Sequence, residues 1–372
     1  MKTYYKDIKS FDFILLSLVI IISIVGIVVI GSATRINVYG ITEAFIDQII
    51  FFISGLVILA VSAFIDIRFI NKFYIVIYMI NISLLIAVLL MDSTTREVQR
   101  WIKIGPATLQ PSEFCKLFMI LFLSKFIANR HDNINKIKNI FFVLSLIGFP
   151  VFLIFLQPAL SASMVVLVLS CVVLYVGGLS HKIVLPAVII GGGLIAFILI
   201  DAHLENPILI DEILKGYQIK RITGESDSQT IFSIEAIASG QLSGKGLFNG
   251  NVNQLNYLVE SHNDFIFSVL SEEFGFIGSV GVLIVMLLII FRILLIGFRS
   301  ISIQGALICA GVAAIIGFQT IFNVGVGTGL LPNTGVTFPF LSAGGSSMWI
   351  CMSSIGFVLN VSMCRVKSIF EE

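Results

Sequence analysis

Charged residues are scarce in this chain. Of its 372 residues only 12% are Asp, Glu, Lys or Arg, whereas 57% are hydrophobic. Soluble domains carry roughly 25% charged residues, and a soluble fold could not bury this much apolar surface. An ordinary globular domain is therefore excluded, and the composition indicates a membrane protein. The net charge is only +1, and no basic stripe is present, which excludes a nucleic-acid-binding protein.

The chain also has few cysteines and no polar linker. The five cysteines are scattered, nearly all within apolar runs, without a CxxC motif or a metal-type spacing to histidine. We therefore expect small buried hydrophobes rather than a redox or metal site. No tandem repeat and no polar linker divides the sequence, so we predict a single membrane domain over residues 1–372.

Long apolar runs follow one another along the whole chain. A membrane span needs roughly 20 apolar residues. This criterion predicts ten helices, near residues 11–31, 46–66, 70–91, 112–128, 139–156, 158–178, 183–202, 264–294, 301–323 and 343–364. The fold class is thus an all-α polytopic membrane protein. The fifth and sixth helices form either a hairpin or one broken helix. The eighth is too long for a simple span, so it either tilts or begins with an interfacial segment.

Lys and Arg residues predict the orientation. With both termini in the cytoplasm, most basic residues fall in short inner loops, as the positive-inside rule requires. Three sizeable segments then lie outside, at 92–111, 203–263 and 324–342. Loops longer than roughly 15 residues are usually functional or disordered. Because residues 203–263 are not of low complexity, we expect a large folded extracytoplasmic loop between the seventh and eighth helices.

The first outer segment reads RWIKIGPATLQPSEFCK, residues 100–116. Trp101 suits a membrane interface, and Pro111 suits the first turn of a helix. Glu113 and Lys116 are three residues apart on one helical face. They form either a local ion pair at a helix start or a functional pair, because ionisable groups at membrane depth are costly and often functional.

Glycine and proline are dense in two further segments. Residues 323–347 read NVGVGTGLLPNTGVTFPFLSAGGSS, without charge. This pattern fits a re-entrant loop buried in protein or a close approach of backbone to a ligand. Residues 236–246 read AIASGQLSGKG. They lack P-loop spacing, which excludes a nucleotide site, and we expect them to shape the outer cavity.

Acidic residues cluster in VESHNDFIFSVLSEEFG, residues 259–275. Asp264 directly precedes an apolar run, so on physical grounds alone it is a helix N-cap. Glu272 and Glu273 lie roughly 12–13 Å further along a helix at 1.5 Å per residue. This depth favours a structural or gating pair over a catalytic one. His262 either orients Asp264 or lies in solvent.

Taken together, RWI, QPSEFCK, AIASGQLSGKG, HNDFIF, SEEFG and GLLPNTGVTFPFLSAGGSS resemble the motifs of the SEDS family (shape, elongation, division and sporulation), which includes RodA, FtsW and SpoVE. The resemblance spans most of the chain in the right order. Asn263, Ala159 and Ala343 stand where the family usually has Thr, Asp and Tyr, which implies a divergent member, with RodA the nearest branch in character.

The resemblance implies a bacterial peptidoglycan glycosyltransferase that polymerises lipid II at the outer face of the cytoplasmic membrane. It also implies a class B penicillin-binding protein as partner. Asp264 inherits the role of catalytic base, and either cationic side chains or a divalent cation (Mg²⁺ or Mn²⁺) would hold the departing pyrophosphate. The predicted substrate-binding residues are Trp101, Lys103, Glu113, Lys116, Arg221 and Lys245. The predicted structural or gating residues are Glu272, Glu273, Pro332, Pro339, Gly344 and Gly345.

Two other functions remain compatible with the sequence. Broken helices and buried charge also fit a flippase of lipid-linked precursors, although no inverted repeat is visible and Asp264 is predicted at the surface rather than at the midplane. A non-catalytic scaffold that activates a penicillin-binding protein is the other alternative. Glycan synthesis that depends on Asp264 would distinguish the enzyme from both.

Overall fold

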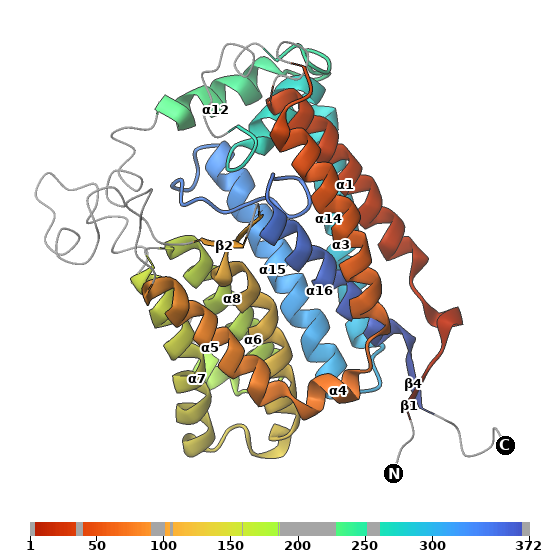
Figure 1. The fold of residues 1–372 in the computed structure, drawn as a ribbon, viewed down its shortest axis with the longest axis vertical. Helices are drawn as coiled ribbons and strands as arrows, with labels where there is room; N and C mark the ends of the chain where they lie inside the picture. Colours follow the sequence, from red (N-terminus) through yellow and green to blue (C-terminus); the bar gives the residue numbers. More distant parts are fainter. Residues whose placement is uncertain are drawn as a thin grey trace, which may run out of the picture.

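The structure is a computed structural model, and it describes residues 4–34, 40–90, 101–104, 107–157, 159–184, 186, 228–250 and 261–366. Helices dominate this part of the chain and lie side by side as a bundle (Figure 1). Six of them are long and apolar enough to cross a membrane, and two shorter apolar helices accompany them. The predicted class, an all-α polytopic membrane protein, is confirmed.

The helices of the bundle follow the predicted spans closely. Their bounds are Phe13–Ala33 (α1), Glu43–Phe64 (α3), Ile67–Lys72 (α4), Tyr74–Leu90 (α5), Pro111–Ala128 (α6), Ile137–Leu156 (α7), Leu160–Val176 (α8), Ile266–Phe298 (α14), Ile303–Gly327 (α15) and Gly345–Met363 (α16). A further helix, Ser228–Ser239 (α12), belongs to the predicted outer loop. Nearly all of the predicted seventh span lies outside the described residues.

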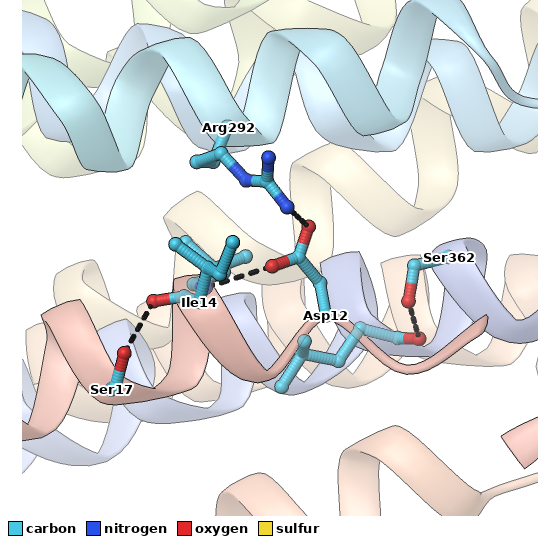
Figure 2. A network of polar contacts seen from close by, with 7 residues as sticks. Asp12, Ile14, Ser17, Arg292 and Ser362 are labelled. Atoms are coloured by element: carbon cyan, nitrogen blue, oxygen red, sulfur yellow. Dashed lines mark hydrogen bonds and ion pairs between the residues drawn. The ribbon is translucent and has the colours of Figure 1, made fainter. Parts of the chain in front are cut away.

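The first and last residues that the structure describes, 4 and 366, lie at one end of the bundle (Figure 1). Two short strands, Tyr4–Lys6 (β1) and Cys364–Val366 (β4), pair there in antiparallel register. An ion pair at the same end of the bundle joins α14 to the start of α1. Arg292 Nη2 on α14 lies 2.6 Å from Asp12 Oδ2, while Asp12 Oδ1 accepts from the Leu15 N–H at 2.8 Å and caps α1 (Figure 2). We call the opposite end of the bundle the outer end.

Helices α3 and α16 pack closely along the bundle. Small residues allow the approach, since a Cβ on Gly356 would meet the Leu59 carbonyl oxygen at 2.5 Å. Polar contacts add to the packing: the Asn360 amide donates to the Ser62 and Ile65 carbonyls at 3.1 and 2.7 Å. Because these carbonyls belong to the last turn of α3 and its C-cap, the amide satisfies groups that the helix leaves open.

Helices α7, α8 and α14 bear on alternatives that the sequence left open. α7 and α8 are separate helices that pack against each other, so they form a hairpin rather than one broken helix. α14 is interrupted at Gly275, whose φ of 66° and ψ of −166° are not helical. A nine-residue segment, Ile266–Phe274, therefore precedes the long run that crosses the bundle. This segment covers most of residues 264–273, where the sequence offered an interfacial start to the eighth span, and its residues 266–273 are buried in the protein.

The short strands were not expected from the sequence. Besides β1 and β4, a hairpin of Ile102–Ile104 (β2) and Ala107–Leu109 (β3) lies within the predicted first outer segment. It leads directly into α6, which begins at Pro111 as predicted. Strands of three residues have too few alternating positions for a period-of-two pattern to stand out.

Candidate functional site

Three segments that are distant in sequence meet at the outer end. The Gln110 N–H donates to Ser346 Oγ at 3.1 Å, and Ser346 Oγ donates to the Thr108 carbonyl at 3.3 Å. These bonds join the β2–β3 hairpin to the start of α16. The loop before α16 in turn contacts residues 261–265, because Ser342 Oγ donates to the Asn263 carbonyl at 2.7 Å. The predicted first and third outer segments and the acidic segment thus meet at this end of the bundle.

Asp264 lies at this junction, one residue ahead of a helix cap. α14 begins at Ile266 with Phe265 in the N-cap position. The expectation that Asp264 is an N-cap is therefore wrong. Its backbone is fixed instead by Asn323, whose Nδ2 donates to the carbonyl oxygens of Asp264 at 3.0 Å and Val336 at 2.8 Å. Asp264 itself is partly exposed.

The glycine- and proline-rich segment is built into the protein. Val336, Phe338, Phe340 and Leu341 are buried. The Ala343 N–H donates to the His262 carbonyl at 2.9 Å. The interpretation as a loop buried in the protein therefore fits the structure better than a loop open to a ligand. The segment contacts the backbone of the acidic segment at His262.

Pro332, Pro339, Gly344 and Gly345 were predicted to be structural. Pro332 is partly exposed and Pro339 is buried. Gly344 adopts a φ of 148° at the N-cap of α16, and its N–H donates to Gln48 Oε1 at 3.1 Å. A Cβ on Gly345 would meet the Phe51 ring at 2.8 Å. Both glycines thus let the chain turn into α16 close to α3.

Glu113 and Lys116 form a buried ion pair in the first turns of α6. Lys116 Nζ lies 2.6 Å from Glu113 Oε2, and the two side chains are only 2% and 11% exposed. The local ion pair that the spacing predicted is therefore present. Its burial is unusual, since exposed pairs on helices contribute little and buried charges need their partners.

The other predicted substrate residues are spread out. Trp101 precedes β2 and is 50% exposed. Lys103 lies on β2 opposite Thr108, and its side chain lies outside the described residues, as does the whole of Arg221. Lys245 contacts Glu272 instead of an open surface, with 2.7 Å between Nζ and Oε1. In the described ranges, no group of three or more His, Cys, Asp or Glu side chains could hold a metal ion.

Glu272 and Glu273 are buried in the short segment of α14. Glu272 contacts Lys245, and Glu273 Oε1 accepts from Ser32 Oγ on α1. The backbone amides of Phe248 and Gly250 also donate to the Glu273 carboxyl. Both carboxyls contact the segment 245–250, and Glu273 also contacts α1, an arrangement consistent with the predicted structural role.

Sequence reasoning missed Asn323, Ser342 and Ser346 as individual residues. They lie at the two ends of a segment whose glycines and prolines had attracted attention, and each carries a short polar side chain without charge. A buried polar side chain among apolar residues must be hydrogen-bonded, and this requirement was the signal available for Asn323, which lies in the apolar run of α15.

Comparison with known proteins agrees with this architecture. The model of a family described as cell cycle proteins, FtsW/RodA/SpoVE, matches residues 12–367. The peptidoglycan glycosyltransferase MrdB of Escherichia coli K12 is 33% identical over 98% of this chain and 96% of that protein. The probable peptidoglycan glycosyltransferase FtsW of Bacillus subtilis is 30% identical over 96% of this chain and 92% of its own length. The stage V sporulation protein E of the same organism is 36% identical over 70% of each chain.

Solved structures share the whole fold. A chain of a peptidoglycan synthase complex that coordinates polymerisation and crosslinking matches with a TM-score of 0.76 and 27% identity, covering 95% of this chain and 97% of that one. The rod shape determining protein RodA of Thermus thermophilus matches with a TM-score of 0.71 and 28% identity, covering 95% and 96%. With a family model along nearly its full length and relatives above 30% identity, this chain belongs to the FtsW/RodA/SpoVE family of cell cycle proteins.

Proposed function

We propose that this protein is a peptidoglycan glycosyltransferase that polymerises lipid II, with Asp264 as the general base. Curated relatives that align along nearly the whole chain are named peptidoglycan glycosyltransferases. The observation that carries the proposal is the position of Asp264. It lies at the outer end, ahead of a helix rather than in its cap, where three outer segments converge.

The chemistry requires a base and a means of holding the leaving group. The acceptor hydroxyl oxygen attacks C1 of the sugar on the lipid carrier, and the bond from C1 to the pyrophosphate oxygen breaks. The proton of the hydroxyl passes to the Asp264 carboxylate as the new glycosidic bond forms. The pyrophosphate leaves with the electron pair of the broken bond, and positive charge nearby stabilises it.

Candidate partners for the pyrophosphate are Lys116, Lys103 and Arg221. Lys116 is held by Glu113 at 2.6 Å, which keeps an ammonium group at membrane depth near the start of α6. Lys103 and Arg221 are candidates because of the family resemblance, and both belong to predicted outer segments. Trp101, half exposed beside β2, offers an aromatic face on which a sugar ring can stack.

Location and partner follow the same relatives. We place the outer end on the extracytoplasmic side of a bacterial cytoplasmic membrane, with the paired termini in the cytoplasm, because basic residues favour that side. We also propose that a class B penicillin-binding protein is the partner. Its support is the structural match to a complex that both polymerises and crosslinks peptidoglycan. Relatives named FtsW and stage V sporulation protein E match as well. We favour an elongation role because of the RodA-like motifs.

Polymerisation by purified protein tests the proposal. The full chain, alone and together with its transpeptidase, is supplied with labelled lipid II, and the glycan products are separated by size. We expect polymer with the native protein and none with Asp264→Ala or Asp264→Asn, which keeps the shape but loses the base. Asp12→Asn at the opposite end of the bundle is the matched control and retains activity.

Three results would overturn the proposal. Polymer of normal length from Asp264→Asn would remove the proposed base. Movement of lipid II across vesicle membranes without any polymer would indicate the flippase, and stimulation of the transpeptidase alone would indicate a scaffold.

A further inference from the structure

At the break in α14 at Gly275, backbone N–H and C=O groups lack the hydrogen-bond partners that a continuous helix would provide. A helix end has unsatisfied N–H or C=O groups, and such groups at membrane depth must be paired within the protein. The φ of 66° with ψ of −166° at Gly275 is a conformation reserved almost entirely for glycine. The break is thus specified by one residue, and something else in the protein has to stabilise it.

Residues 240–246, which we call the brace, satisfy this break from both sides. The N–H groups of Lys245 and Gly246 donate to the carbonyls of Glu272 and Glu273, both at 3.0 Å. In the other direction, the N–H groups of Phe276 and Ile277 donate to the carbonyls of Gln241 and Leu242, at 2.9 and 3.2 Å. Four backbone bonds therefore join the brace to both sides of the break.

The glycines of the brace make this contact possible. A Cβ on Gly240 or Gly244 would collide with the backbone of Ser271 or Glu273, and a Cβ on Gly275 would collide with the backbone of Gly244. Gly244 also has a φ of 79°. The motif SGQLSGKG is therefore shaped to lie against a broken helix, which explains its glycines without any nucleotide or phosphate.

An ion pair fastens the brace to the helix through side chains. Lys245 Nζ lies 2.7 Å from Glu272 Oε1, and the Glu272 side chain is 0% exposed. Ser239 Oγ donates to the same oxygen at 3.3 Å. A fully buried carboxylate depends strongly on such partners, so the position of Glu272 is coupled to that of Lys245.

Asp264 is attached to the other end of the same short segment. Residues 266–274 form a helical piece of nine residues. Asn323 and Ser342 hold the chain ahead of it through the Asp264 and Asn263 carbonyls, and the brace holds its far end. Its orientation, and with it the direction in which Asp264 faces, depends on both anchors.

We propose that Lys245, acting through Glu272, is a positioning residue for Asp264 and not a contact of the pyrophosphate. This inference rests on the proposed function of Asp264. Misplacement of a reacting group by about 1 Å costs about 100-fold in rate. Release of the brace therefore lowers kcat, while the KM for lipid II stays near its native value because no substrate contact is lost.

The test compares Lys245→Met, Lys245→Arg and Ser239→Ala with the native protein in complex with its transpeptidase. We expect kcat to fall about 10- to 100-fold in Lys245→Met, with the KM for lipid II unchanged within twofold. Lys245→Arg keeps the charge and restores most of the rate. Leu242→Ala is the matched control on the same loop: its side chain is 64% exposed and only its backbone joins the helix.

Hydrogen exchange provides a readout that does not depend on catalysis. In Lys245→Met we expect faster exchange at the Phe276 and Ile277 amides and within residues 266–274, and in Leu242→Ala no change. If Lys245→Met does not fold, Ser239→Ala gives the same comparison with a milder change.

Three results would overturn the inference: an increase in KM with native kcat, which would identify Lys245 as a substrate contact; native kinetics in Lys245→Met; or native exchange in residues 266–277. Failure of Asp264 as the base would appear separately, as polymer made by Asp264→Asn, and would leave the exchange result intact.

Discussion

Replacing Lys116 by Met removes the positive member of a buried ion pair and keeps much of its volume. The Lys116 side chain is 2% exposed and the partner Glu113 is 11% exposed, with 2.6 Å between the charged atoms. Breaking such a pair from one side costs about 3 to 5 kcal/mol, because the remaining charge has lost its compensation. We therefore expect Lys116→Met to be strongly destabilised and inactive.

The double variant Glu113→Gln/Lys116→Met separates stability from chemistry. Neutral replacement of both members of a buried pair is often close to neutral for stability. We expect thermal unfolding in detergent to return to within about 1 kcal/mol of the native value on the same reasoning. If Lys116 also holds the pyrophosphate, polymerisation of lipid II stays at the level of the single variant.

The outcome for activity decides between the two roles of this pair. A double variant that regains both its stability and its polymerisation rate would show that the pair is structural only, and Lys116 would be withdrawn as a pyrophosphate partner. Glu113→Gln alone is the second single variant of the double-mutant cycle. Its loss of stability, combined with the other two values, gives the coupling energy between the two side chains.

Two further predictions concern the two ends of the bundle. Asn323→Ala removes both hydrogen bonds to the Asp264 and Val336 carbonyls. Because each lost bond costs about 1 kcal/mol, we expect moderate destabilisation in a melting experiment together with a lower kcat. An unchanged kcat would contradict the proposed anchoring of Asp264 by Asn323. Arg292→Ala leaves the Asp12 carboxylate, whose side chain is 9% exposed, without its guanidinium partner. We expect a lower melting temperature with native kcat and KM. A selective loss of kcat would show that the two ends of the helix bundle are coupled.

Much of the helical framework could be predicted from the sequence. The first apolar run predicted a helix over 11–31, and α1 covers Phe13–Ala33. The start of α6 at Pro111 followed from the missing N–H of proline. These features depend on local properties, namely apolar length and backbone chemistry, which a sequence states directly.

The site was harder to predict because its contacts join distant residues. Ser32 and Glu273 are 241 positions apart, and a pattern along the chain carries no information about that meeting. Glu272 could be recognised as too deep for a solvated charge, but its partner Lys245 could not be identified without the fold. The mistaken N-cap at Asp264 arose because an acid before an apolar run commonly caps a helix, whereas here the first turn begins two residues later.

The role of Gly275 could not be predicted from the sequence either. Gly275 in SEEFG reads as one weak position in a long helix, because an isolated glycine costs only about 1 kcal/mol there. The backbone torsions of Gly275 and its contact with the brace show that the helix is interrupted at this residue. Two glycine-bearing motifs that looked independent are the two halves of one contact.

The tight fit between α3 and α16 has a consequence for biogenesis. α16 is the least apolar of the six candidate spans, and most of its residues are buried against other helices. It is also the last of them to leave the ribosome, so the helices that it packs against are synthesised before it. A truncation that removes α3 would therefore leave α16 in direct contact with lipid, with Asn360 and its serines unsolvated, and quality-control proteases would be expected to clear the product.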